Sequence, residues 1–361
     1  MTARSRPLVM VDQRLAQRRR TGIARVITRT REAMTADPPP DMDVMWVSGP
    51  RGLPRRNALT SLGNLILDML WLGVLLPRRA RRHGASLIHV PMNWGPLRGR
   101  TPTTVMIQDL AFERMPAAYP RGFRLWASLL GRRSAGRARL VMATTGAGAR
   151  DIEEIYGVPR ERIHVVHLGS TPDDQVLRHG REPFILAVGE FEPRKRVLDL
   201  MDGHDRYFAS TPAEPPICRL VIAGAGGSQA AAAHARRGLG CDLLGFIDDE
   251  DLHDLYRRAT LFVSLSAYEG FGLPIVEAMA HGCPVLVADN SSQAEVAGEG
   301  AFLIRDPSPN AVAARLSEVL ADREALARRG EAARERAAHL SWTATARGTA
   351  EVWREALGLP R

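Results

Sequence analysis

Two glutamates, Glu269 and Glu277, stand eight positions apart in the stretch SAYEGFGLPIVEAMAHGCPVLVADN, residues 266–290. An ionised carboxylate accepts hydrogen bonds from two neighbouring hydroxyls, so the pair could bind the hydroxyls of a sugar and of a ribose. The glycines between them let a ligand approach the backbone, and Pro274 suits the first position of a helix. A helix start offers free N–H groups to a diphosphate. A capped surface helix with solvated acids fits the same spacing equally well.

One lysine, Lys195, stands among 49 basic residues, and the other 48 are arginines. It lies in the run FEPRKR, directly after the apolar stretch FILAVG that predicts a strand from Phe184. A compact ammonium differs chemically from a planar guanidinium, and fixed cations stabilise the charge that develops on a departing diphosphate. Lys195 is therefore a candidate cation of a nucleotide-sugar site. A solvated basic turn, with the lysine retained by chance, is the alternative.

Three further motifs are weaker. Gly22, in the turn RRRTGIAR, would let a phosphate or sugar approach the start of the first helix. The run VIAGAGGS has Gly224 and Gly226, but Gln229 takes the position of the third glycine of a dinucleotide fingerprint, which argues against a nicotinamide site. Of the Asp-x-Asp patterns at 41–43 and 249–251, the second opens a helix and fits N-capping. The histidines show no ligand spacing, and we expect no metal site.

The elements that must position these residues alternate between short β-branched runs and helical patterns. This order predicts an α/β protein with parallel sheets covered by helices on both faces. We expect two Rossmann-like domains, over 1–170 and 181–340, joined by a linker at 171–180. The last helix, within 341–361, could pack on either domain or cross back to the first. Ligands bind beyond the carboxyl ends of parallel strands, so the two domains would face a cleft that contains the motifs.

Composition limits the classes of function. With 361 residues, 45% hydrophobic and 25% charged, the chain is typical of a soluble protein of two domains. It has no apolar run of about 18 residues, no signal peptide, and three scattered cysteines that suit neither disulfides nor zinc. We therefore expect a cytoplasmic protein.

The charge is divided unevenly, with a net +16 over residues 1–165 and −7 over residues 166–361. This asymmetry predicts an anionic partner at one end of the chain. No nucleic-acid-binding motif accompanies it and aromatic residues are only 6%, so we do not expect nucleic acid. An anionic membrane surface or a phosphorylated acceptor explains the charge as well, and so does a coding bias toward arginine.

The run GEFEPRKR and the stretch from LLGFIDDEDLHDLYRRA to AEVAGEGAFLI resemble the retaining glycosyltransferases of family 4, which have the GT-B fold. The segments VDQRLAQRRRTGIARV, IQDLAFERMPAAYP and GVPRERIHVVHLG are similar to other parts of the same family, so the resemblance covers most of the chain. It implies a hexosyltransferase that moves a sugar from a nucleotide-sugar donor to a saccharide or lipid-linked acceptor in polysaccharide or glycolipid assembly. The family uses neither a metal nor a protein nucleophile.

The resemblance implies roles for the residues at matching positions. Lys195, together with Arg194, would bind the donor diphosphate. Glu269 would contact the transferred sugar, and Glu277 the nucleotide ribose. Asp109 would serve the acceptor. The other matching positions would line the donor or frame its base, and they are Gly22, Gly245, Phe246, Ile247, Gly270, Phe271, Gly272 and Leu273.

Two positions depart from the family pattern. Many members have a histidine where this chain has Gln108, and an arginine where it has Glu190, for which Arg194 would substitute. Glutamine can bind a hydroxyl but cannot take up a proton, so the changes predict altered specificity or weak activity. The opening DQR…TGIAR resembles mannosyltransferases, which makes GDP-mannose the first expected donor, ahead of UDP- and dTDP-sugars. The alternatives are a non-catalytic nucleotide-sugar-binding protein, a sugar-nucleotide epimerase and a nucleic-acid binder.

Two segments of the first domain combine apolar and basic residues. Residues 62–82 read LGNLILDMLWLGVLLPRRARR, and residues 121–139 read RGFRLWASLLGRRSAGRAR. Both resemble interfacial helices that rest on anionic lipid, which predicts peripheral contact with the inner face of the cell membrane. A core helix with a solvated basic end is the alternative for each.

Overall fold

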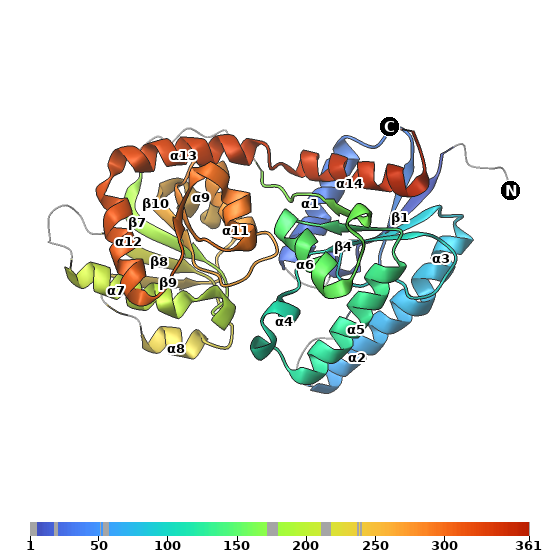
Figure 1. Ribbon diagram of the computed structural model, residues 1–361, viewed down its shortest axis with the longest axis horizontal. Helices are drawn as coiled ribbons and strands as arrows, with labels where there is room; N and C mark the ends of the chain where they lie inside the picture. Colours follow the sequence, from blue (N-terminus) through green and yellow to red (C-terminus); the bar gives the residue numbers. More distant parts are fainter. Residues whose placement is uncertain are drawn as a thin grey trace. The chain divides into compact units, whose positions relative to one another are not determined.

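The computed structural model describes residues 6–17, 21–50, 52, 58–171, 180–210, 218–236, 238 and 240–360. The chain forms two compact units (Figure 1). The first comprises Met1–Leu168 with Trp342–Arg361, and the second comprises Gly169–Ser341. Each is built on a six-stranded sheet, which confirms the predicted α/β class. Most of the linker predicted at 171–180 lies outside the described residues.

The sheet of the first unit has the strand order β2-β1-β3-β4-β5-β6, and all its pairings are parallel. Its inner strands are buried along their whole length, as expected for apolar strands that helices cover on both faces. The strands are β1 Leu8–Asp12, β2 Asp43–Val47, β3 Leu87–Val90, β4 Thr103–Ile107, β5 Leu140–Ala143 and β6 Ile163–Val165.

Helices follow β1, β2, β4 and β5 of the first unit, whereas a loop joins β3 directly to β4. Thr21 caps the first of these helices, because its side-chain oxygen accepts a hydrogen bond from the Ala24 amide. The helices are α1 Gly22–Ala36, α2 Ala58–Leu70, α3 Leu76–Arg82, α4 Ala111–Arg114, α5 Arg121–Arg137, α6 Gly146–Tyr156 and α14 Trp342–Leu357.

A π-helical turn at Trp71–Leu75 joins α2 to α3. Trp71 and Leu72 are buried there, while Leu75 is exposed. The apolar pattern of residues 62–82 gives no sign of this wider turn. It divides the segment into buried and exposed apolar side chains, so part of the segment belongs to the core.

The last helix, α14, belongs to the first unit (Figure 1). Its Trp353 is fully buried and lies 5.1 Å from the His89 ring, between ring centroids. On its outer side Arg354 donates to Asp41, from Nε to Oδ2 at 2.6 Å. That hydrogen bond lowers the pKa of Asp41 and outweighs its desolvation. The helix is therefore an integral part of the unit formed by the beginning of the chain.

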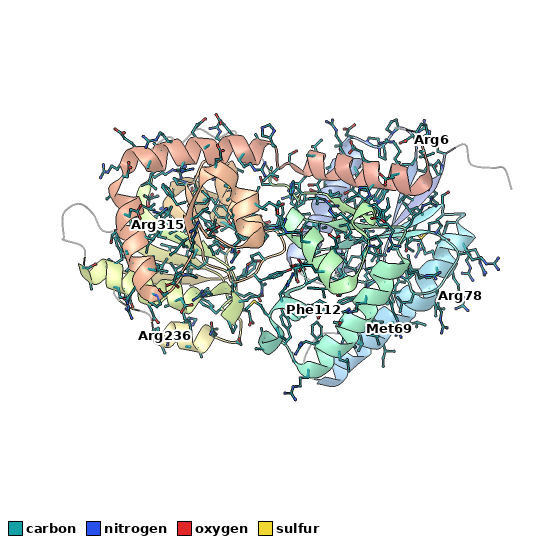
Figure 2. The ribbon with its side chains drawn as sticks, viewed as in Figure 1. Arg6, Met69, Arg78, Phe112, Arg236 and Arg315 are labelled. Carbon is teal, nitrogen blue, oxygen red and sulfur yellow. The ribbon has the colours of Figure 1, made fainter. Side chains whose placement is uncertain are left out.

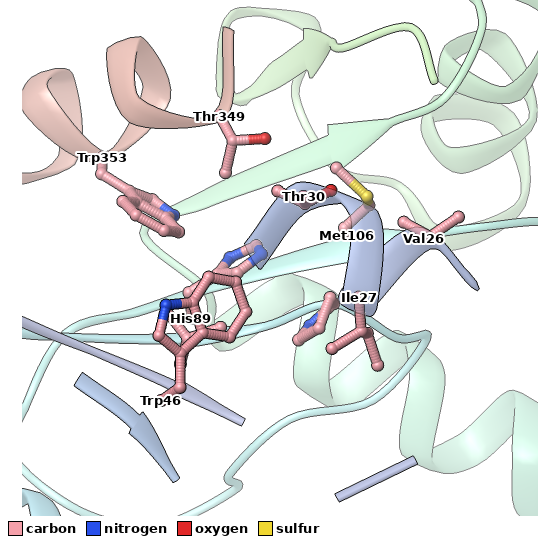
Figure 3. Close-up of a pocket in the computed structure, with 10 residues that line it drawn as sticks. Val26, Ile27, Thr30, Trp46, His89, Met106, Thr349 and Trp353 are labelled. Carbon is pink, nitrogen blue, oxygen red and sulfur yellow. The ribbon is translucent and has the colours of Figure 1, made fainter. Parts of the chain in front are cut away.

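A small cavity lies under α14 in the first unit, between the sheet and α1 (Figure 3). Its lining is mostly apolar and includes Ile27, Trp46 and Trp353. His89 also lines it, and burial lowers the pKa of this histidine to about 3, so its ring is neutral. None of the predicted site residues lines this cavity.

The sheet of the second unit has the order β12-β11-β10-β7-β8-β9, again all parallel. Its strands are β7 Glu182–Val188, β8 Arg219–Ala223, β9 Cys241–Gly245, β10 Ala259–Ser264, β11 Val285–Ala288 and β12 Ala301–Ile304. Its helices are α7 Val197–Ser210, α8 Ala230–Ala235, α9 Asp249–Arg258, α10 Leu273–Ala280, α11 Ser291–Ala297, α12 Pro309–Ala321 and α13 Arg323–Ala338.

Strand β12 is the element that the sequence pattern does not reveal. It has four residues, AFLI, and follows a glycine-rich turn, so its only strong signal is its pairing with β11. In the first unit, β4 ends at Ile107, and residues 108–110 after it form a loop. Among the described residues, no helix is both long and apolar enough to cross a bilayer.

Candidate active site

Lys195 and Glu269 meet at the carboxyl end of the second sheet. Lys195 lies in the 3₁₀ turn Pro193–Lys195 after β7, and Glu269 lies in the loop after the neighbouring strand β10. Lys195 Nζ donates to Glu269 Oε1 at 2.5 Å, and Arg194 Nη1 donates to Oε2 at 3.2 Å. The Ala267 amide also donates to the Arg194 carbonyl at 2.7 Å. The two loops are thus joined by backbone and by charge.

Two opposing effects set the ionisation of Glu269. Its side chain is only 12% exposed, and this burial favours the neutral acid. The positive charges of Lys195 and Arg194 outweigh burial and hold the pKa of Glu269 below its ordinary value. Glu269 is therefore an ionised carboxylate at neutral pH, held by two cations in the described structure.

The start of α10 follows Glu269 directly. Gly272 has φ of 96°, and a Cβ there would lie 2.9 Å from Ile275 Cδ1, so both backbone conformation and space favour glycine. Leu273 is the first residue of α10, and Phe271, two residues earlier, is buried. The helix begins at the same sheet edge as Lys195, as the spacing predicts. Its first amides can act as donors to an anion.

Glu277 lies one turn into α10 and is 8% exposed. Its Oε2 accepts a hydrogen bond of 3.1 Å from the hydroxyl of Tyr256, on α9. The second glutamate of the pair is therefore a largely buried carboxylate with a side-chain partner from a different helix. The sequence gives no indication of this partner.

Three glycine-containing loops meet beside Lys195. The Gly224 amide donates to the Gly245 carbonyl at 2.8 Å, and the Gly189 amide donates to the Ala223 carbonyl at 3.0 Å. Gly245 has φ of 72°, and the following Phe246 is 68% exposed, with Ile247 half-buried. The predicted base-framing loop thus lies at the end of β9, the strand next to β8.

A close backbone contact fixes the approach of two of these loops. A Cβ on Gly224 would lie 2.0 Å from the carbonyl oxygen of Gly189, so a larger residue would push the loops apart. Glu192 adds a side-chain bridge, because it accepts hydrogen bonds from the amide and the hydroxyl of Ser228. The glycine-containing segment 221–228, which lacks the full dinucleotide fingerprint, therefore supports the turn that carries Lys195.

The loop of Glu269 has a second support, which sequence reasoning missed. Gln293, on α11, is fully buried; its Nε2 donates to the Ser266 carbonyl at 2.6 Å and its Oε1 accepts from the Ser264 hydroxyl at 2.7 Å. Ser292 Oγ donates to the Glu269 carbonyl at 2.5 Å. Asn290 Nδ2 donates to the Ser266 carbonyl as well. Polar side chains after β11 thus bind the loop after β10.

The two predicted site residues of the first unit lie in separate segments. Gly22 is the exposed first residue of α1, next to its cap Thr21. Asp109 follows β4, where its Oδ1 accepts from the Ala111 amide at 3.0 Å and its carbonyl accepts from Asn93 Nδ2 at 2.7 Å. Gln108 precedes it, and its amide donates to Asn93 Oδ1. Asp109 thus helps to begin the short helix α4.

A buried ion pair in the first unit also escaped the sequence analysis. Asp12, the last residue of β1, and Arg14 are 2% and 1% exposed and form an ion pair with each other. Burial raises the pKa of Asp12, although the adjacent Arg14 opposes the change. Arg14 Nε also lies 3.3 Å from Asp68 Oδ1 on α2. The pair anchors the 3₁₀ turn Arg14–Gln17 that follows β1.

Metal ligation finds no support in side-chain geometry. Within the described residues, no group of three or more histidine, cysteine or acidic side chains is placed to hold a metal ion. The cations Arg194 and Lys195 are the charged groups next to Glu269. Anion binding by these side chains and by the start of α10 is the chemistry that this edge offers.

Comparisons with known proteins agree with this architecture. The chain is similar to the solved structure of sucrose-phosphate synthase from Thermosynechococcus elongatus, with a TM-score of 0.72, 18% identity and coverage of 98% of this chain and 100% of that one. The Anabaena protein HepE, solved in complex with UDP and glucose, gives a TM-score of 0.65 at 17% identity, covering 96% and 99% of the two chains. The two parallel-sheet units thus define a protein of the GT-B class.

Family comparisons refine the class. Residues 16–173 match the family described as Glycosyltransferase Family 4, and residues 171–336 match the one described as Glycosyl transferases group 1. The O-antigen chain mannosyltransferase B of Escherichia coli is 28% identical over 295 residues, which cover 74% of this chain and 75% of the relative. Of several other relatives the chain spans only about half the length. The protein belongs to glycosyltransferase family 4 and is a hexosyltransferase by family.

Proposed function

We propose that this protein transfers a hexosyl group from a nucleotide sugar to a saccharide or lipid-linked acceptor, with retention of configuration at the sugar. The ion-paired cluster of Lys195, Arg194 and Glu269 at the carboxyl end of the second sheet carries this proposal. Mannose from GDP-mannose is the first choice of sugar and donor, supported by the similarity to a mannosyltransferase. UDP is the other nucleotide to test first, because the similar HepE structure contains it.

Each predicted site residue of the second unit has a proposed role in donor binding. Lys195 and Arg194 neutralise the diphosphate as it departs, which stabilises the transition state in a water-poor site. Glu269 binds hydroxyls of the transferred sugar, and the backbone from Gly270 to Leu273 lines its phosphate. Glu277 accepts hydrogen bonds from the ribose. Gly245, Phe246 and Ile247 frame the base.

The proposed reaction needs no protein nucleophile. The bond between the anomeric carbon and the phosphate oxygen breaks while the acceptor oxygen bonds to the same face of that carbon. The acceptor proton passes to the departing phosphate oxygen, and Lys195 and Arg194 carry the negative charge. Because fixed cations supply this stabilisation, we propose that turnover is independent of divalent metal. Asp109 and Gly22, in the first unit, are assigned to the acceptor side and to the glycine loop.

The first experiment is a calorimetric titration with GDP-, UDP- and dTDP-sugars. One nucleotide should bind clearly to the wild type, and Glu277→Ala should weaken it, whereas the control Glu331→Ala on the exposed face of α13 should not. Turnover of that donor with EDTA present, and NMR of the product's anomeric configuration, test metal independence and retention. Failure of all three donor classes to bind would reject the proposal.

A non-catalytic nucleotide-sugar-binding protein is the second candidate, favoured by Gln108 and Glu190. Gln108 Nε2 lies 3.7 Å from Met106 Sδ, and Glu190 is exposed. Gln108 lacks the proton-accepting group of the histidine that many family members have there. Glu190 lacks the positive charge of the arginine at its position. Tight donor binding without hydrolysis or transfer to any acceptor would favour this candidate over the enzyme.

We further propose that the first unit rests on anionic lipid. Apolar side chains are exposed on α2, its π-helical turn and α5, and arginines are exposed on α3 and α5. Met69 and Arg78 are labelled on this part of the molecule in Figure 2. This combination of apolar and cationic side chains complements an acidic bilayer surface. The apolar side chains are Ile66, Met69, Leu70, Leu75, Leu125 and Leu129, and the arginines include Arg78, Arg79, Arg81, Arg82, Arg121, Arg132 and Arg133.

Flotation with liposomes tests the membrane contact. Vesicles with phosphatidylglycerol should carry the protein at low salt, and uncharged phosphatidylcholine vesicles should not. The double change Ile66→Asp and Leu125→Asp should abolish flotation, while exposed Phe246→Asp in the second unit should leave it intact. Absence of the wild-type protein from acidic vesicles at low salt would reject lipid contact.

A further inference from the structure

Tyr256 is a side chain outside α10 that contacts Glu277. It lies on α9, is fully buried, and its hydroxyl donates to Glu277 Oε2 at 3.1 Å. A tyrosine in this environment needs a hydrogen-bond partner, because a buried hydroxyl without one is costly. This hydrogen bond satisfies the Tyr256 hydroxyl. It also constrains the Glu277 carboxylate, which is the group that a ligand would contact.

Several contacts hold the Tyr256 ring in place. The ring is stacked on His281 at 5.8 Å with an interplanar angle of 16°, and it meets the edge of Phe262 at 5.8 Å. His281 is itself held, because its Nε2 lies 2.7 Å from Nδ1 of His253. The hydroxyl therefore sits at the end of a ring that is packed on both its face and its edge.

The backbone around Tyr256 is fixed by one arginine. Arg181 Nη1 donates to the carbonyls of Arg257 and Ala259 at 3.0 and 2.9 Å. Its Nη2 donates to the carbonyl of His281 at 3.2 Å, just past the end of α10. Arg181 thus ties the end of α9 to the end of α10, so the two helices that carry Tyr256 and Glu277 move together.

We propose that Tyr256 is a positioning residue for recognition of the nucleotide ribose, acting through Glu277. This inference rests on the proposed function, in which Glu277 accepts hydrogen bonds from the ribose. A free glutamate side chain has three rotatable bonds and loses that freedom when it binds a ligand. The tyrosine orders it in advance by holding one oxygen. A carboxylate has about four acceptor positions, so one hydrogen bond from a tyrosine leaves capacity for a ribose.

A purely structural role for Tyr256 predicts a different outcome. If its hydroxyl only joined α9 to α10, its loss would lower stability and weaken all nucleotides equally. If it orients Glu277 toward ribose, its loss should weaken the recognition of the ribose hydroxyls specifically. The discriminating quantity is therefore the ratio of affinities for a ribonucleotide and its 2′-deoxy counterpart, measured in each variant.

The experiment compares GDP with 2′-deoxy-GDP and UDP with 2′-deoxy-UDP by calorimetry. For the nucleotide that binds, we expect wild-type protein to lose about tenfold in affinity on removal of the 2′-hydroxyl, the size of one hydrogen bond to a charged group. In Tyr256→Phe the same removal should cost about threefold or less, and in Glu277→Ala about nothing. Adding Tyr256→Phe to Glu277→Ala should change the ratio no further.

Two controls separate this inference from the proposed function. Tyr207→Phe, another buried tyrosine of the second unit, should keep the wild-type ratio. The inference would be overturned if Tyr256→Phe kept the wild-type affinity ratio, or if it weakened the ribonucleotide and its 2′-deoxy counterpart equally. Either result would leave the donor site intact. Failure of both ribonucleotides to bind the wild type would instead overturn the proposed function.

A second variant covers the case in which Tyr256→Phe does not fold, as judged by circular dichroism. Glu277→Asp leaves the tyrosine packing unchanged but withdraws the carboxylate by one methylene from the hydroxyl. It should lower the ribonucleotide preference to about threefold or less, like Tyr256→Phe. Full retention of the wild-type preference in Glu277→Asp would contradict the positioning role.

Discussion

The carboxyl-end loops of the two sheets are organised differently. In the second unit, charged and polar side chains bind a neighbouring loop, as Lys195 does with the Glu269 carboxylate and Gln293 with the Ser266 carbonyl. In the first unit, the acid Asp109 accepts a hydrogen bond from an amide only two residues away, and Asn93 bonds backbone atoms of Gln108 and Asp109. Two buried charges of this unit, Asp12 at the end of β1 and Arg14 just after it, pair with each other.

This difference fits a division of labour between the units. A nucleotide sugar has a diphosphate whose charge must be met at fixed points, and pre-ordered cations serve that need. A side-chain contact within one loop, such as that of Asp109 with the Ala111 amide, constrains the neighbouring loops less, which suits the proposed acceptor site of the first unit. The comparison leads to four predictions, ordered from the largest expected effect to the smallest.

Lys195→Ala should have the largest effect. Removal of the ammonium should lower kcat by about 10²- to 10³-fold, because charge on the departing diphosphate would lose a fixed partner. Lys195→Arg should retain part of the activity, and Arg328→Ala on exposed α13 should retain all of it. Steady-state kinetics with the donor identified by calorimetry would show this. An unchanged kcat in Lys195→Ala would place the stabilising charge elsewhere.

Gln293→Leu should show how far the second unit's loops depend on one another. The change leaves the Ser266 carbonyl and the Ser264 hydroxyl without the buried amide, at a cost of about 1–3 kcal/mol in the free energy of unfolding. Loosening of the Glu269 loop should lower kcat/KM about tenfold. The half-buried Gln229→Leu change, in a different loop, is the control for added apolar surface.

The stability measurement can separate the units. All six tryptophans, residues 46, 71, 94, 126, 342 and 353, belong to the first unit, so their fluorescence follows that unit alone. Far-ultraviolet circular dichroism follows both. Gln293→Leu should therefore shift a dichroism transition to lower denaturant and leave the fluorescence transition unchanged. A shift of the fluorescence transition instead would mean that the loop stabilises the first unit.

Asp109→Asn should affect the acceptor but not the donor. Asparagine can accept the same hydrogen bond from Ala111, so stability should change by less than about 0.5 kcal/mol. Donor affinity should be unchanged, while kcat/KM for the acceptor should fall about tenfold if the carboxylate binds the reacting hydroxyl. Measuring the two substrates separately checks this. A loss of donor affinity would contradict the assignment of roles to the two units.

The pH dependence of Glu269 should give the smallest effect. Its folded pKa lies below the ordinary value of 4.5, so its ionisation stabilises the fold above that pH. The contribution is lost as pH falls through the folded pKa. The difference in unfolding free energy between wild type and Glu269→Gln should therefore be constant from pH 8 to about 5 and shrink below pH 4.5. A difference that grows on acidification would mean a raised pKa.

The sequence predicts those parts of the site that depend on short segments. Glu269, the glycine turn and α10 lie within about a dozen residues, and Lys195 follows a strand that must end at the same sheet edge. The supports depend on packing between distant segments. Tyr256 reaches Glu277 across 21 positions and Glu192 reaches Ser228 across 36. Neither spacing has a local signature, because tertiary contacts decide which helix faces meet.

The same reasoning explains the differences in the fold. Apolar β-branched runs with turns at both ends reveal eleven of the strands, but β12 has only four residues and needs its neighbour to form. The π-helical turn at Trp71 follows from the burial of that indole in the core rather than from any preference of the local residues. Local propensity does not contain this information.

Helix α14 gives the protein an unusual order of assembly during its synthesis. Residues 342–357 are translated after the whole second unit, yet Trp353 fills the interior of the first. The ribosome therefore releases a complete second unit before the first has all its parts. Until α14 emerges, the face beneath it, with His89 and Trp46, lacks its cover. Nascent chains paused before residue 342 should accordingly be the ones that chaperones recognise.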